Sequence, residues 1–88
     1  MNQVDFTVSV TGGAGIGVFI KVDGNVLHFA SSGTQSVSLV PTDYTAILSG
    51  AEPSSASVNI QVAENGNVLC QTTYNTTTFW GFLAFTVN

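Results

Sequence analysis

The chain contains no arginine and one lysine, Lys21, among its 88 residues. Charged residues make up 7% of it, against roughly 25% in an average soluble domain, and the formal net charge is −4. Nucleic-acid binding depends largely on clustered Lys and Arg that contact phosphates, and anionic membrane surfaces attract the same side chains. The composition therefore argues against both kinds of partner, and it predicts a polar surface of hydroxyl and amide groups.

Reactive side chains are equally scarce, since Cys70 and His28 are the only residues of their types. A lone cysteine forms no disulfide within the chain. Nucleophilic catalysis needs a nucleophile, a base and a group that orients the base, and the sequence offers neither this set nor a Gly-x-Ser-x-Gly motif. The turns around Asp23 and Asn65 lack the series of oxygen ligands of a calcium loop. We therefore predict no enzymatic activity, no metal site and no cofactor.

Long apolar runs are missing too, because apolar and polar residues alternate and no run approaches the eighteen residues of a membrane span. A strand pattern begins within four residues of Met1, which leaves no room for a signal peptide. We expect one domain over residues 1–88. Either the protein stays inside the cell or it leaves by a route that this chain does not record, and among compartments we favour a cell surface or a virion.

The feature that the sequence does contain is alternation with a period of two. In residues 4–10, valine and phenylalanine alternate with polar residues, which is typical of a half-buried strand. The pattern recurs along the chain, with a polar break at residues 31–35, a loop at residues 50–57 and a closing strand at about residues 78–87. It predicts an antiparallel β-sandwich of seven or eight strands, with Greek-key, Ig-like topology and no helix.

Two dipeptides predict the turns of hairpins. Asp23-Gly24 and Asn65-Gly66 suit type I′ turns, in which both central residues have positive φ. The first turn sets a register in which Phe19 opposes His28 and Lys21 opposes Val26 on the outer side. The residues expected in the core are Val8, Val18, Ile20, Phe29, Leu39, Ile60 and Phe85.

One stretch resembles a known group of modules. Residues 16–50 contain the hairpin "KVDGNVL" followed by "VSLVPTDYTAILSG". This resembles the small Ig-like or prealbumin-like extracellular modules of the PEGA type, which carry a Leu-x-Pro-Gly-x-Tyr-Thr turn after a V-D-G hairpin. Thr42-Asp43 departs from the family's Gly and polar residue. The resemblance implies a scaffold or a binder, and it implies no catalytic chemistry.

Aromatic residues gather in the closing strand "TFWGFLAFTV", and the period of two sorts them into two sets. Phe79 and Phe85 fall on one side with Leu83 and Val87, and we assign that side to the core. Trp80 and Phe82 then point outward. The candidate binding or interface residues are Trp80, Phe82, Phe19, His28 and Tyr74.

A neutral surface with clustered rings fits two functions, and a strand covered on both faces is the plain structural alternative. In the first, the domain is a structural subunit that packs against copies of itself or a larger protein, as in a virion decoration or tail component, a filament or a surface layer. In the second, Trp80 and Phe82, with or without Tyr74, form a platform for a neutral glycan, with Asn75 and nearby threonines supplying hydrogen bonds. We favour assembly, because sheet edges in a domain of low charge need covering.

Overall fold

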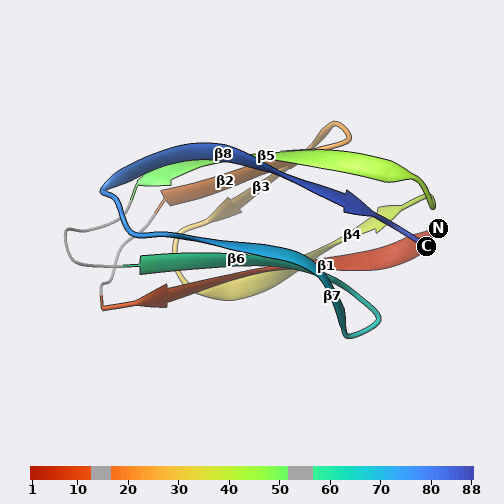
Figure 1. Ribbon diagram of the computed structural model, residues 1–88, viewed down its shortest axis with the longest axis horizontal. Coiled ribbons are helices and arrows are strands. Elements are labelled where there is room, and N and C mark those ends of the chain that lie inside the picture. The colour runs from red at the N-terminus through yellow and green to blue at the C-terminus, as the bar shows by residue number, and fades with distance from the viewer. Residues whose placement is uncertain (13–16, 52–56) are drawn as a thin grey trace.

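The computed structural model describes residues 1–12, 17–51 and 57–88, and these form eight β-strands and no helix. Two antiparallel four-stranded sheets pack face to face: sheet A has the order β4-β1-β6-β7, and sheet B has the order β3-β2-β5-β8 (Figure 1). The predicted β-sandwich is confirmed. None of the described residues belongs to a helix that could cross a membrane. The strands are β1 (Asn2–Thr11), β2 (Gly17–Val22), β3 (Asn25–Phe29), β4 (Gly33–Leu39), β5 (Asp43–Ala51), β6 (Ser57–Glu64), β7 (Asn67–Tyr74) and β8 (Thr78–Thr86).

The strand order repeats one unit twice. In the first half β1 pairs with β4 in sheet A, and the hairpin β2-β3 lies in sheet B. In the second half β5 pairs with β8 in sheet B, and the hairpin β6-β7 lies in sheet A. Strands β1 to β4 and strands β5 to β8 thus each form a Greek key whose strands lie in both sheets. Each strand of the first half lies in the opposite sheet from its counterpart in the second half, as β1 and β5 do. The tetrapeptide Gly-Asn-Val-Leu begins at the second central residue of both hairpin turns, at residues 24–27 and 66–69.

Both predicted turns have the expected backbone. Asp23 and Gly24 have φ of 48° and 80°, and Asn65 and Gly66 have φ of 52° and 82°. Glycine reaches this region without steric cost, and Asp and Asn tolerate it better than other residues. In the β2-β3 hairpin, Phe19 stands opposite His28 and Lys21 opposite Val26, as the sequence predicts.

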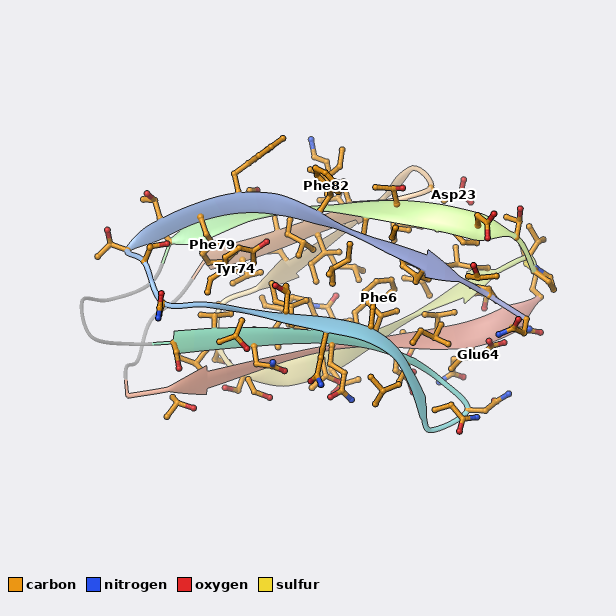
Figure 2. The ribbon with its side chains drawn as sticks, in the orientation of Figure 1. Phe6, Asp23, Glu64, Tyr74, Phe79 and Phe82 are labelled. Carbon is orange, nitrogen blue, oxygen red and sulfur yellow. The ribbon has the colours of Figure 1, made fainter. Side chains whose placement is uncertain are left out.

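The core lies between the two sheets, where every second residue of each inner strand points inward. Phe6 of β1 lies at its centre, and its ring meets that of Phe85 edge to face at 5.9 Å between centroids (Figure 2). All seven residues predicted for the core are buried. The complete buried apolar cluster is Val4, Phe6, Val8, Val18, Ile20, Val22, Leu27, Phe29, Leu39, Ala46, Leu48, Val58, Ile60, Val62, Phe79, Phe85 and Val87.

Two expected loops are shorter than the sequence suggests. The polar break predicted at residues 31–35 is wrong at its end, because β4 begins at Gly33 and pairs with β1 from that residue. Similarly, Gly50 and Ala51 continue β5 because β2 and β8 pair with them on both sides. Pairing partners far along the chain extend strands through polar and small residues that show no alternation. The flexible connection predicted at residues 12–15 and the middle of the second loop lie largely outside the described residues.

The two chain ends lie side by side at one end of the sandwich (Figure 1). Glu64, which is only 6% exposed, links them there. The amide nitrogen of the Asn2 side chain donates to Glu64 Oε2 over 2.6 Å, and the backbone N–H of Asn88 donates to Glu64 Oε1 over 3.1 Å. The Asn2 amide also donates to the carbonyl of Asn88. A buried carboxylate is tolerated here because both of its oxygens accept hydrogen bonds.

An aromatic stack fills the opposite part of the interior. The rings of Tyr74 and Phe79 are parallel, with centroids 4.5 Å apart, and both lie between the sheets (Figure 2). Two glycines make room for them. A Cβ at Gly50 would lie 2.7 Å from Cζ of Phe79, and a Cβ at Gly81 would collide with the hydroxyl oxygen of Tyr74. Both positions therefore require glycine for space.

Replacing Phe85 with alanine tests the side of β8 that faces the core. Phe85 is 6% exposed, so we expect the free energy of unfolding to fall by about 3–5 kcal/mol in denaturant titrations of dilute protein. Phe82→Ala is the matched control on the same strand, and its effect on the dilute protein should stay within about 0.5 kcal/mol because the ring is 64% exposed. Equal losses for the two variants would contradict this packing.

Gly81→Ala should destabilise the fold by about 1–3 kcal/mol, because the new methyl group overlaps the Tyr74 hydroxyl. Tyr74→Phe removes that oxygen and leaves Cζ at 3.3 Å as the nearest atom. The double variant should therefore be more stable than Gly81→Ala alone. A double-mutant cycle measured by urea unfolding checks the coupling, and strictly additive effects would refute the contact.

Candidate functional site: the outer face of sheet B

The outer face of sheet B carries two rows of side chains that cross all four strands. Because opposed residues in neighbouring strands point to the same side, the register alone defines the rows. One row runs across the sheet through His28, Phe19, Ser49 and Trp80. The next row is Val26, Lys21, Ile47 and Phe82. We call these eight residues the aromatic face.

The apolar members of the aromatic face are open to solvent. Trp80 is 70% exposed and Phe82 is 64% exposed, and Phe82 points away from the sandwich (Figure 2). The Trp80 and Phe82 rings meet edge to face, with centroids 6.4 Å apart. At the other side of the sheet Phe19 stacks on His28 at 4.6 Å and 15° between ring planes. Contiguous exposed apolar side chains of this kind are typical of a contact surface.

The aromatic face includes the ammonium group of Lys21, which is the only residue of the protein that is lysine or arginine. The described residues form no salt bridge, so no carboxylate among them is in direct contact with the Lys21 ammonium group. Its aliphatic stem stands between Val26 and Ile47 and can cover apolar surface while the ammonium group stays in water. The chemistry available here is apolar contact, ring stacking and one positive charge.

Sheet A presents a different outer face, on which hydroxyl, amide and carboxylate groups predominate and Val68 of the edge strand β7 is exposed. The hydroxyl of Ser36 donates to Asp5 Oδ1 over 2.6 Å, and Gln3 donates to the same oxygen over 3.2 Å. These hydrogen bonds lower the pKa of the Asp5 carboxyl. The hydroxyls of Thr7 and Thr34 bond across the same two strands at 2.9 Å. On this face polar side chains of β1 and β4 bond to one another, whereas on the outer face of sheet B the rings stay exposed.

Four of the five candidate residues predicted from the sequence, Trp80, Phe82, Phe19 and His28, lie on the aromatic face. Tyr74 does not, because it points into the sandwich and stacks on Phe79. Ile47 is the residue that sequence reasoning left out. Its outward phase is readable from the alternation, but its place between Lys21 and Phe82 follows from β5 lying between β2 and β8.

The two reactive side chains lie on different layers. His28 belongs to the outer face of sheet B, whereas Cys70 lies in β7 of sheet A and packs against the core. The structure therefore does not bring them together as a nucleophile and a base. In the described parts of the chain, no three His, Cys, Asp or Glu side chains gather as metal ligands would. A search of family models, of curated proteins and of solved structures finds nothing that matches this chain.

Burial raises the pKa of the Cys70 thiol, because the thiolate loses hydration inside the sandwich. At neutral pH we expect Cys70 to react with a thiol reagent more slowly in the folded protein than in urea, with a rate that rises as pH increases toward the raised pKa. Labelling reactions quenched at timed intervals and analysed by mass spectrometry measure the two rates. Faster labelling in the folded protein would indicate an activated cysteine.

Proposed function

We propose that this protein is a non-enzymatic structural subunit that packs through its aromatic face against copies of itself or against a larger protein. The observation that carries the proposal is the contrast between the two outer faces. Sheet A has polar groups bonded to one another, and sheet B exposes Trp80, Phe82, Phe19, Val26 and Ile47 in adjoining rows. Buried aromatic residues, Trp above all, supply much of the energy of protein interfaces.

The composition supports the same function. A net charge of −4 with few ionic side chains leaves little repulsion to keep subunits apart. A partner surface must be largely apolar, and it gains affinity where a carboxylate faces Lys21. The resemblance of residues 16–50 to PEGA-type modules agrees with a scaffold or binder, and a virion or cell surface is where we expect such a subunit to work.

The glycan alternative uses the same rings. Its platform consists of Trp80 and Phe82, and Tyr74 adds no third ring because it stacks on Phe79 in the interior. The remaining pair meets edge to face, so the two rings do not form one flat surface for stacking. These contacts favour assembly over binding of a sugar.

The test is the molar mass measured by light scattering across a concentration series, with Trp80 emission as a second signal. We expect the mass to rise above the 9.1 kDa of the monomer. Trp80 is the only tryptophan and is exposed, so its emission should shift to shorter wavelength as assembly covers it. Phe19→Ser and Ile47→Ser each remove an apolar side chain of the aromatic face from an inner strand, β2 or β5. Each substitution should raise the protein concentration at which half of the chains are assembled about tenfold or more.

Gln61→Ser is the matched control, since Gln61 lies on the outer face of sheet A opposite Thr7. It should leave both signals unchanged. Assembly that is insensitive to Phe19→Ser and Ile47→Ser refutes the role of the aromatic face. A mass that stays at 9.1 kDa to several hundred micromolar refutes self-assembly, and a Trp80 shift with neutral oligosaccharide at that constant mass supports the glycan alternative.

A further inference from the structure

We propose that β8 pairs with β8 of a second copy of this chain in a two-fold symmetric, antiparallel contact that joins the two B sheets into one eight-stranded sheet. The inference rests on the proposed assembly function and adds to it the partner and the geometry. Three independent features of β8 carry it: an uncovered edge, the direction of its free backbone groups, and a sequence that is complementary to itself.

The first feature is the edge itself. β5 pairs with one side of β8, and no strand among the described residues pairs with the other side. β8 is nine residues long and contains neither a charged residue nor proline. Natural edge strands are normally kept short, charged, bulged or covered, because their free N–H and C=O groups otherwise pair with another chain. β8 has none of these protections.

The second feature is which backbone groups face outward. The N–H of Val87 donates to the carbonyl of Thr42 over 3.0 Å, and these residues stand opposite each other when the β5-β8 register is extended by one. Hydrogen-bonded pairs recur at every second residue, so the odd-numbered residues of β8 bond to β5. The even-numbered residues therefore direct their N–H and C=O groups to the open edge. Trp80, Phe82 and Ala84 are the central three.

Within the described chain, no hydrogen bond reaches those outward groups of Trp80, Phe82 or Ala84. Only the start of the edge is engaged, where the Thr76 hydroxyl donates to the carbonyl of Thr78 over 2.7 Å. The edge of β3 differs, because Gln35 Nε2 donates to the carbonyl of His28 over 2.6 Å. β7 differs as well, since its pairing with β6 has an irregularity of the kind that protects edges. β8 is thus better prepared for a partner strand than β3 or β7, and with nine residues it is longer than the fourth edge strand, β4, which has seven.

The third feature is the sequence of β8, "TFWGFLAFT", which has Phe82 at its centre. Thr, Phe, Phe, Phe and Thr recur at the same positions when the strand is read backward. Antiparallel pairing about Phe82 places Trp80 opposite Ala84 of the second copy, and Gly81 opposite Leu83 of the second copy. A large side chain then meets a small one at these two kinds of pair, whereas Phe82 meets Phe82 and Phe79 meets Phe85 of the second copy. Such cross-strand complementarity stabilises a sheet.

The pairing also extends the aromatic face. The row Val26, Lys21, Ile47 and Phe82 would continue from Phe82 into the same row of the second copy in reverse order. Both copies then expose their rings on the same side of one wide sheet. An edge contact and a face contact are therefore compatible, and each can be broken without the other.

The test is disulfide cross-linking of Phe82→Cys in a Cys70→Ser background, with oxidised glutathione as the oxidant. In the proposed pairing, residue 82 of one copy stands opposite residue 82 of the other in a hydrogen-bonded pair, where the two Cα atoms are about 5.5 Å apart. That distance lies within the range of roughly 4.4–6.8 Å that a disulfide requires. We expect most of the protein to become a covalent dimer at concentrations where wild-type protein is dimeric.

Ala84→Cys in the same background is the matched control on the same strand and face. In the proposed register the two copies of residue 84 are offset by four residues, about 13 Å along the strand, so little cross-linking should occur. Ala84→Pro is an independent variant, because it removes an outward N–H that has no partner in the monomer. It should weaken dimerisation at least tenfold relative to Ala84→Ser while the circular dichroism spectrum stays unchanged.

The outcomes separate this inference from the proposed function. If the mass responds to Phe19→Ser and Ile47→Ser but Phe82→Cys does not cross-link, or cross-links no better than Ala84→Cys, then β8 pairing is wrong and face-mediated assembly stands. If Phe82→Cys cross-links selectively and the face variants change nothing, the edge is the contact and the aromatic face is not. A wild-type monomer at every concentration overturns β8 pairing.

Discussion

The register of two hairpins is the constraint on which the rest of this structure depends. The turns at Asp23-Gly24 and Asn65-Gly66 require positive φ at both central residues. They fix which residues face each other throughout β2-β3, and in β6-β7 as far as the irregularity between Ala63 and Val62. A slip of one residue would turn Phe19 and Lys21 into the core and Ile20 out of it. No salt bridge among the described residues adds to the turn geometry, side-chain packing and hydrogen bonds that hold this register.

The two halves use the same topology for different purposes. Each half contributes one hairpin to one sheet and one strand pair to the other, so both sheets are built from the same two components. Their outer faces diverge. Residues such as Gln3, Asp5 and Ser36 bond to one another on sheet A, whereas Ile47 and Phe82 have no comparable cover on sheet B. The shared topology therefore accounts for the sandwich itself, whereas the function that we propose depends on the outward residues of sheet B.

Local patterns predicted what depends on near neighbours in the chain. The period of two placed Phe85 inside and Trp80 outside, and a turn dipeptide set the β2-β3 register. What remained hidden depends on contacts between distant strands. Tyr74 turns inward because glycine at position 81 leaves room for its hydroxyl, and Ile47 joins the aromatic face because β5 lies between β2 and β8. No property of either residue alone reveals these neighbours.

Acidic side chains gather at the end of the sandwich where the two chain ends meet. Asp23 and Glu64 lie there (Figure 2), and Asp43 pairs with Thr86 at the last residue of β8. Any assembly that aligned these ends would bring the negative charges of two copies together with only Lys21 to offset them. An antiparallel contact through β8 directs the acidic ends away from each other and places the uncharged middle of the strand at the contact. The charge distribution thus favours the orientation that the sequence of β8 independently selects.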